Sequence, residues 1–466
     1  YQRQTGALTY ICLALLMLSA SLVSDNDFIK RFIRITLIVG IILIIYGNLQ
    51  YFGLEPFPYV NAYTVNAPIG TFGNPNFQSA FMGMIGVISF TMALNQAFKS
   101  SIKIGLALVG VASLIVVYET LSKQGFLNFT AGLGAVVILW LFMTKRNTLG
   151  LAASGLGAVG AIFTFLGLIN TGPLANILYK GSLEARGYYW RAGLKILTEH
   201  PFFGVGMDGF GNWYARVRPS DYAAKGFFSW SNSAHNVFLD IGSSGGFILL
   251  AIYLAIFVLV VISIIKIVKR STGFDVYFVA LVGAWVAYQS QSLISINQIG
   301  LAIWGWVLSG LIIGYEINTR VKDTAQSIPT RGKQQIKKAK ISIQPLSSCA
   351  VITLLVGTIV GAIVAGPIFF SNSRFYSAIK ANDLKGVESA AYLYPQDQRR
   401  LFMLAGIYRN AKMDAKAVEV LKESTLTYPD SYDMWNLWLT IPTATPSDIA
   451  YAKAQLKRLD PFNPDL

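Results

Sequence analysis

The sequence predicts an all-α fold: a polytopic membrane bundle of about ten spanning helices, with a large outer loop and a small helical-repeat domain. Three observations predict this class. The 466 residues are 54% hydrophobic and only 13% charged, whereas soluble domains carry roughly a quarter charged residues. Apolar runs of about 20 residues, the length that crosses a bilayer as a helix, recur along the chain. Basic residues are concentrated in every second connection between these runs.

Ten segments are apolar and long enough to be expected as spanning helices. They are residues 6–23, 32–53, 77–98, 102–120, 125–143, 149–170, 236–265, 274–294, 298–317 and 346–370. The sequence begins at Tyr1 without a methionine or a basic signal-peptide segment, so we expect that N-terminal sequence, with room for further helices, is missing.

The connections between these segments indicate their orientation. Five of them hold 17 basic residues, namely 24–34, 99–103, 144–148, 266–272 and 318–345. The short connections that alternate with them, 54–76, 121–124 and 295–297, hold only Lys123. Cytoplasmic loops carry the excess of Lys and Arg, so the five basic connections are expected in the cytoplasm. The loop 171–235 and the tail 371–466 then lie outside it.

The formal charge of +15 is therefore chiefly a topology signal, and no nucleic-acid partner is expected. The basic connection 318–345 is either a solvated loop that touches anionic membrane lipids or a specific lipid-binding or regulatory segment. Cys12 and Cys349 are far apart and the chain has two histidines. These numbers indicate neither a disulfide framework nor a metal site, so we expect no metal and no cofactor.

The domain organisation follows from these segments, with a membrane domain over 1–370 and a second domain over 371–466. In the tail, Tyr394-Pro395 and Tyr428-Pro429 are 34 residues apart, which is the length of a tetratricopeptide helix pair. The middle repeat places seven residues at its packing positions: Leu401, Leu404, Ala405, Tyr408, Ala417, Leu421 and Ser424. Such a domain could be a docking surface for a protein partner, a lid, or an unspecific helical cap.

The loop 171–235 is too long to be a simple connection, and long loops are often functional. Residues 187–199 in it are expected to form a short helix on the membrane surface. Gly204, Gly206 and Gly209 match the G-x-G-x-x-G pattern of dinucleotide sites, but no strand precedes them as that fold requires. These glycines more plausibly form a turn that brings the backbone close to another group.

Four arginines of this loop are candidates for binding phosphate, because the planar guanidinium pairs with phosphate in a bidentate manner. They are Arg186, Arg191, Arg216 and Arg218. The structural alternative is that they pair with Glu184, Glu199 or lipid head groups. His235 precedes an apolar helix and is a candidate general base, or else a capping or interfacial histidine. His200 has the surroundings of a loop residue.

Two further outer segments carry candidates. Asn74 and Asn76 precede an apolar helix and are expected as substrate contacts or as caps of that helix. Lys123 is the only basic residue of the short outer connections. It indicates an anionic partner nearby, or an ion pair with Glu119.

Together these patterns resemble the O-antigen ligase and O-antigen polymerase superfamily over roughly residues 35–315. The resemblance is carried by Arg186-x-x-x-Trp190, by Pro201-x-x-Gly204-x-Gly206-x-x-x-Phe210, and by His235-Asn236 before a hydrophobic helix. The segment Gly70–Asn76 also resembles the family's sequence before a core helix. The tail resembles C-terminal extensions found in some members.

The resemblance implies a metal-independent glycosyltransferase in the bacterial cytoplasmic membrane, whose donor is a glycan on polyprenyl (undecaprenyl) diphosphate. The acceptor would be a lipid, a glycan or a protein, so ligase, polymerase and protein O-oligosaccharyltransferase remain open. Arg186 would bind the diphosphate and His235 would activate the acceptor hydroxyl. Substrate contacts would come from Arg191, Lys123, Arg216, Arg218, Asn236, Trp190, Asn74 and Asn76.

One departure concerns a short outer loop, where the family often has a Ser-Arg pair and this chain has Ser122-Lys123. Lysine keeps the charge but loses the planar fork. Two other classes also fit a polytopic chain: a transporter or flippase of lipid-linked glycan, and a docking protein with an inert membrane anchor. A transporter usually places ionisable or broken-helix features near the bilayer midplane and shows internal repeats. Here the spans carry few central charges and no repeat between the halves is obvious.

Overall fold

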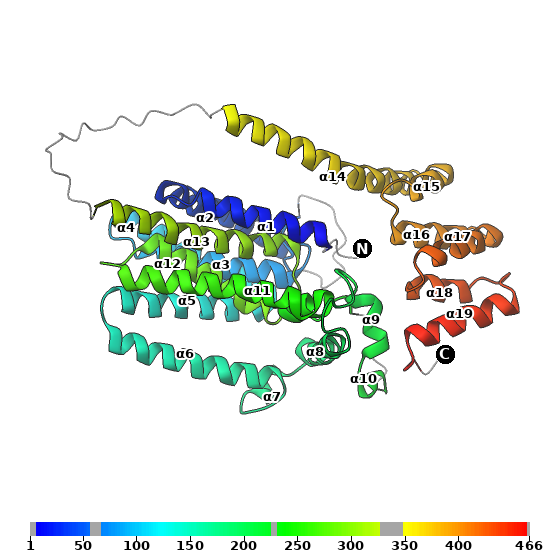
Figure 1. Cartoon of the computed structure of the whole chain (residues 1–466), viewed down its shortest axis with the longest axis horizontal. Helices are drawn as coiled ribbons and strands as arrows, with labels where there is room; N and C mark the ends of the chain where they lie inside the picture. The colour runs from blue at the N-terminus through cyan, green and yellow to red at the C-terminus, as the bar shows by residue number, and fades with distance from the viewer. Residues whose placement is uncertain (1–5, 56–66, 225–230, 327–347, 464–466) are drawn as a thin grey trace. The chain divides into compact units, whose positions relative to one another are not determined.

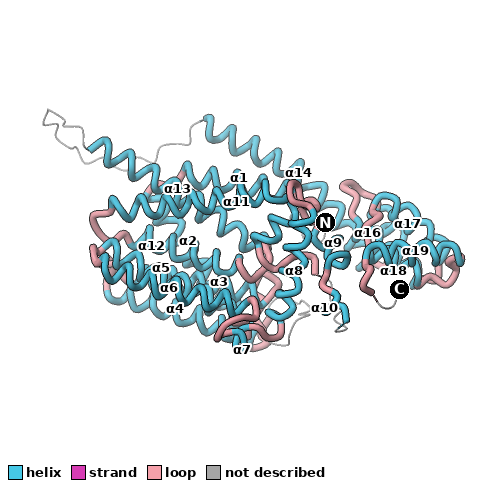
Figure 2. Tube along the Cα trace, turned by 60° about the horizontal axis from the view of Figure 1, so that its bottom comes forward, coloured by secondary structure: helices cyan, strands magenta, loops and turns pink. Residues whose placement is uncertain are grey.

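The computed structural model is helical throughout the residues it describes, which are 6–55, 67–224, 231–326 and 348–463. Figure 2 shows helices and loops and no strand in this part of the chain. The helices form two compact units, one built from α1 to α13 and the other from α14 to α19. The predicted all-α class is confirmed.

The long helices of the first unit run side by side in Figure 1. They are α1 (Ala7–Leu22), α2 (Asn26–Tyr51), α3 (Pro75–Ala93), α4 (Ser100–Glu119), α5 (Gln124–Met143), α6 (Asn147–Leu168), α11 (Val237–Arg270), α12 (Val276–Ser292) and α13 (Ile299–Gln326). With α14 (Ser348–Lys380) of the second unit, every segment expected to span contains a helix.

Length and apolar content make six of the described helices candidate membrane spans, which identifies a multi-pass membrane protein. They are α4, α5, α6, α11, residues 299–320 of α13 and residues 355–380 of α14. α1 is apolar but has only 16 residues. The larger number of about ten spans stays a prediction.

Capping residues fix where the helices around the candidate site begin. Asn74 accepts a hydrogen bond from the Asn76 amide, and Pro75 follows it as the first residue of α3. Asn236 caps α11 by accepting from the amides of Phe238 and Leu239. These caps pair amide groups that a helix leaves free in its first turn.

Helices α3, α5 and α12 approach one another through glycines, as is common where helices pack inside a membrane. A Cβ added at Gly83 of α3 would lie 2.5 Å from the Gly125 carbonyl oxygen of α5. One added at Gly132 of α5 would lie 2.6 Å from the Gly283 oxygen of α12. α3 is buried along most of its length, whereas α6 buries only Gly150, Gly167 and Leu168. The outer position of α6 leaves its apolar side chains to face lipid.

The basic connections of the first unit meet at one end of the bundle. Lys145 Nζ donates to the Ser271 carbonyl at 2.8 Å and so joins two of them. At the same end, Arg270 pairs with Glu316 of α13 at 2.8 Å, and Lys30 lies 5.9 Å from the Tyr277 ring centre of α12. The alternation read from the sequence therefore corresponds to two distinct ends of the helix bundle. The assignment of the basic end to the cytoplasm stays a prediction.

The described part of the loop 171–235 is largely helical and lies at the other end of these helices (Figure 1). It contains α7 (Ala175–Leu178), α8 (Ser182–Glu199), α9 (Phe210–Val217) and α10 (Ser220–Ala224). The expected helix at 187–199 is confirmed, but it begins at Ser182, so Arg186 lies one turn inside it rather than at its start. The buried aromatic rings of Tyr188, Tyr189, Phe210, Tyr214 and Tyr222 form a core for this segment.

The second unit contains α14, α15 (Leu384–Ala391), α16 (Gln398–Asn410), α17 (Asp414–Thr427), α18 (Tyr432–Leu439) and α19 (Pro446–Leu459). All seven residues that the 34-residue period placed at packing positions are buried in its core. α14 continues through Pro367 to Lys380, and its Phe375 joins that core. The tetratricopeptide identity and the boundary at 370/371 stay predictions.

Candidate functional site

The glycines of the outer loop hold residues 201–206 against a break in α11. The break lies at Gly246, which has φ +67° and ψ −169° inside an otherwise helical run. Val205 donates its amide to the Ser243 carbonyl at 2.9 Å, and Gly206 donates to the Ser244 carbonyl at 3.0 Å. Phe247 donates to the Pro201 carbonyl at 2.7 Å. The expectation of a turn that brings backbone close to another group is confirmed.

Close packing explains why glycine stands at these positions. Gly204 has φ +63°, and a Cβ there would lie 2.4 Å from the Ser243 carbonyl oxygen. A Cβ on Gly246 would lie 2.3 Å from the Phe202 carbonyl oxygen. Gly206 also has a positive φ of +91°, but open space surrounds its Cβ position. The first two glycines thus permit the contact itself, and the third permits only the turn.

His235 lies in a strained turn directly before α11. Its backbone has φ +53°, a conformation that is uncommon outside glycine and often found at functional sites. Asp240 stabilises the turn by accepting from the Ser233 hydroxyl at 2.7 Å and from the Ala234 amide at 2.6 Å. Ser233 Oγ in turn accepts from the His235 amide at 3.0 Å. The carboxylate of Asp240 therefore fixes the backbone that carries the imidazole.

Arg186 and Asn236 bind neighbouring carbonyls of the connection between α12 and α13. The Arg186 guanidinium donates to the Ile294 carbonyl, and Asn236 Nδ2 donates to the Leu293 carbonyl at 2.9 Å. Trp190 Nε1 donates to the His235 carbonyl at 3.4 Å. The structure thus brings together Arg186, Trp190, His235 and Asn236, which the sequence singled out from two separate segments.

The electrostatics of Arg186 are unusual. Its side chain is buried, with 7% relative exposure, and burial lowers its pKa to about 10. It is still protonated at neutral pH. Within the described residues no carboxylate lies at ion-pair distance from it. A buried cation without an acidic partner is energetically costly, so an anion bound here would be strongly favoured.

The remaining loop arginines lie around the aromatic core of the loop. Arg191 pairs with Asp221 at 3.1 Å and its guanidinium lies 4.5 Å from the Tyr188 ring centre. Its expected partners were Glu184 and Glu199, whereas the observed one is 30 residues away. Arg216 lies 4.5 Å from the ring centre of Trp213, on α9. Arg218, at the end of α9, is buried.

The Ser122-Lys123 connection lies against the segment that begins α3. Ser122 Oγ donates to Asn76 Oδ1 at 2.7 Å. The Lys123 side chain is exposed, and the described part of the chain shows no ion pair between it and Glu119. Leu127, one turn into α5, packs with Trp190 and Ile294 in one apolar cluster. This cluster connects the lysine loop to the surroundings of Arg186.

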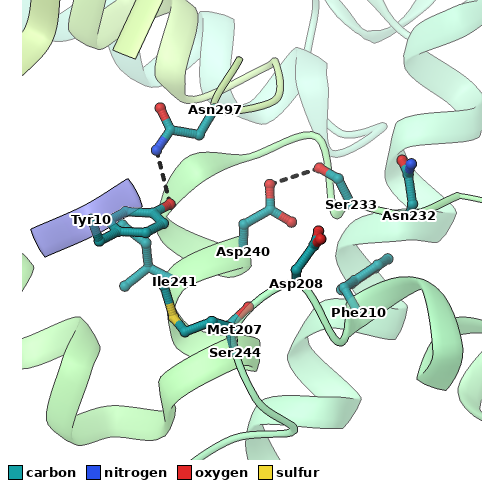
Figure 3. A pocket seen from close by; sticks show the side chains of 10 residues that line it. All are labelled: Tyr10, Met207, Asp208, Phe210, Asn232, Ser233, Asp240, Ile241, Ser244 and Asn297. Carbon is teal, nitrogen blue, oxygen red and sulfur yellow. Dashed lines mark hydrogen bonds between the residues drawn. The ribbon is translucent and has the colours of Figure 1, made fainter. Parts of the chain in front are cut away.

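A small polar cavity of about 30 Å³ lies beside the His235 turn. Figure 3 shows the Asp208 and Asp240 side chains converging on it, with Tyr10 hydrogen-bonded to Asn297 at 2.8 Å. Ten residues line it: Tyr10, Met207, Asp208, Phe210, Asn232, Ser233, Asp240, Ile241, Ser244 and Asn297. Asp208, Asp240, Tyr10 and Asn297 were not predicted from the sequence. Of these, only Asp240 could have been found from the sequence, because it lies five residues after His235 in the first turn of the predicted helix.

Two further expectations concern His200 and metal binding. His200 ends α8 and its ring lies 4.5 Å from that of Trp213, so it is a packed loop residue. Among the described residues no group of three or more His, Cys, Asp or Glu side chains could hold a metal ion. Metal independence stays a prediction about activity.

Residues 106–254 match the family model described as O-Antigen ligase. The match covers about a third of the chain and runs from α4 into α11. It includes Lys123, Arg186, Trp190, His235 and Asn236, and ends before the connection that Arg186 and Asn236 bind. Curated proteins gave no match to the chain.

Proposed function

We propose that this chain is a membrane glycosyltransferase of the O-antigen ligase type. It transfers a glycan from polyprenyl (undecaprenyl) diphosphate to an acceptor hydroxyl at the outer face of the bacterial cytoplasmic membrane, without a metal ion. The observation that carries the proposal is Arg186, a buried cation that lacks an acidic partner in the described structure and lies beside the His235 turn. The match to an O-antigen ligase model over the same segment supports the substrate class.

In the proposed reaction, the acceptor oxygen attacks the anomeric carbon of the glycan. A new glycosidic bond forms as the bond between that carbon and the diphosphate oxygen breaks. The acceptor's proton passes to the imidazole of His235, and the diphosphate leaves with the electron pair. A positioned base contributes on the order of 10²–10⁴ in rate.

The leaving diphosphate is stabilised by cations more than by protonation. Arg186 supplies a charge that persists at neutral pH in a low-dielectric setting, where preorganised charges are most effective. Lys123 and Arg191 reach the same substrate from the neighbouring loops and, being exposed, adapt to it. Asn76, which accepts from Ser122, holds the loop that carries Lys123. Asn74 and Asn76 contact the glycan, and Arg216 and Arg218 bind its outer part.

The polar cavity next to Ser233 is the subsite for the acceptor hydroxyl. Its volume of about 30 Å³ holds a group the size of a hydroxyl or one water. Asp208, Asp240 and Asn297 provide oxygen and nitrogen partners for such a group. The acceptor is a lipid, a protein or a growing glycan, so a polymerase or a protein O-oligosaccharyltransferase with the same donor chemistry is the alternative.

The test uses the purified full chain with an undecaprenyl-diphosphate-linked glycan and an acceptor extract. His235→Ala and Arg186→Ala should each reduce transfer by about 10²-fold or more. His200→Ala, at the second histidine, and Arg399→Ala, at an exposed arginine of the tail, are matched controls that should retain it. Folded His235→Ala and Arg186→Ala variants with full transfer would refute the site. Abolition of wild-type activity by EDTA would refute metal independence.

A further inference from the structure

Two buried amide side chains in α5 are unexplained by packing. Gln124 is the first residue of α5 and Asn128 lies one turn later, so both side chains project from the same face of the helix. Their relative exposures are 5% and 0%. Such positions in a membrane bundle are normally apolar, because a buried polar group needs a hydrogen-bond partner.

Most of the hydrogen-bonding capacity of these amides is unused. Neither Nε2 nor Oε1 of Gln124 has a partner in the part of the chain that the structure describes. Asn128 Oδ1 accepts from the Ser290 hydroxyl of α12 at 3.0 Å, but its Nδ2 has no partner among the same residues. Buried polar groups left unpaired in a native structure require a reason, such as a bound water or ligand.

The surroundings of the two amides are those of the candidate site. Lys123 immediately precedes Gln124. Leu127, between the two amides, packs against the apolar cluster that contains Trp190 and Ile294, and the Ile294 carbonyl is the partner of Arg186. The unpaired amides therefore lie on the helix that begins beside the exposed cation Lys123 and that touches, through Leu127, the cluster whose Ile294 binds the buried cation Arg186.

The chemistry of Gln124 separates two classes of ligand. A diphosphate offers only acceptors, so it would pair with Nε2 and leave Oε1 unpaired. A sugar offers hydroxyls, and each hydroxyl both donates and accepts. Only a group of the second kind satisfies both ends of the Gln124 amide, with a further acceptor for Asn128 Nδ2.

We infer that Gln124 and Asn128 form a hydrogen-bonding subsite for the sugar directly attached to the donor's diphosphate. This inference rests on the proposed function and deepens it. The two cations hold the diphosphate, and the two amides select the pyranose next to it. The subsite therefore discriminates a glycosylated lipid from the undecaprenyl diphosphate that remains after transfer.

The test measures binding to the full chain in lipid nanodiscs with two probes. One is undecaprenyl diphosphate, and the other is undecaprenyl diphosphate that carries one N-acetylhexosamine. The variant Gln124→Met keeps the side-chain volume and removes both polar atoms. Ser89→Ala is the matched control. Ser89 Oγ is also buried without a partner among the described residues, but it lies near the C-terminal end of α3, whereas the Ser122-Lys123 loop contacts Asn76 at the N-terminal end.

Gln124→Met should raise the Kd of the glycosylated lipid about tenfold, the effect of one or two lost hydrogen bonds. The Kd of undecaprenyl diphosphate should change less than about twofold, and the Tm should not fall because no protein hydrogen bond is lost. Ser89→Ala should leave both values of Kd unchanged. If Gln124→Met does not fold, Gln124→Asn, whose amide is one carbon shorter, should show the same selective loss.

Two results would overturn the inference. An unchanged Kd for both probes would mean that water occupies the subsite. An equal loss for both would mean that Gln124 binds phosphate rather than sugar. A wild-type chain that binds neither probe and transfers no glycan would instead contradict the proposed function, so the two failures are distinguishable.

Discussion

Alanine at Gly204 should release the segment 201–206 from the break in α11. The left-handed backbone of Gly204 costs alanine roughly 1–2 kcal/mol. The new Cβ would lie 2.4 Å from the Ser243 carbonyl oxygen, so the segment 201–206 must move away from the α11 backbone. Separation breaks the bonds from Val205 and Gly206, each worth about 0.5–1.5 kcal/mol. The bound arrangement is thus weakened by about 2–5 kcal/mol in total.

Hydrogen exchange of the 201–209 peptide measures this change. A loss of about 2 kcal/mol corresponds to exchange roughly 30-fold faster at the Val205 and Gly206 amides. Gly206→Ala is the matched control, since its φ is also positive but its Cβ position is open. This variant incurs only the free-energy cost of the left-handed backbone and no steric clash with α11. Equal exchange in the two variants would refute the reasoning, because the contact with α11 would then contribute nothing.

Three other predictions address the site and the tail. Asp240→Asn removes one of two acceptors that fix the His235 turn, so kcat should fall about tenfold with an unchanged donor KM; a change confined to Tm would contradict a positioning role. Arg186→Lys should move the alkaline loss of transfer to lower pH. The wild-type cation persists below its pKa of about 10, whereas burial lowers the pKa of lysine from an ordinary value of about 10.4, and an unmoved alkaline limb would count against Arg186. Thr445→Ala removes the capping box of α19, which should destabilise that helix by about 1 kcal/mol and speed its amide exchange without affecting transfer; unchanged exchange would show that the cap is dispensable.

The helical architecture was predictable from the sequence because it depends on composition and on local signals. Apolar runs give the helices, and Asn74 gives the start of α3. The residue that caps α11 is Asn236, where the sequence had suggested His235 as a possible cap. The buried pattern of the tail was also predictable, since a fixed period places Leu404 and Leu421 on the inward faces of their helices.

The connections between distant segments could not be predicted in the same way. The partner of Arg186 is a backbone carbonyl 108 residues away, and carbonyls carry no sequence signal. The polar cavity combines Tyr10 with Asn297, which are 287 residues apart. The break in α11 depends on backbone pairing with Pro201 and Val205, so Gly246 alone did not reveal it. Side chains that meet only through the fold remain hidden in a single sequence.

The most direct test of the central claim is the release of undecaprenyl diphosphate. The purified full chain receives the undecaprenyl-diphosphate-linked glycan with and without an acceptor, and both lipid products are quantified. The account predicts acceptor-dependent release of undecaprenyl diphosphate in amounts equal to the glycosylated product, with release lost in His235→Ala. Movement of intact lipid-linked glycan across a proteoliposome membrane, without any release of undecaprenyl diphosphate, would contradict it and identify a transporter.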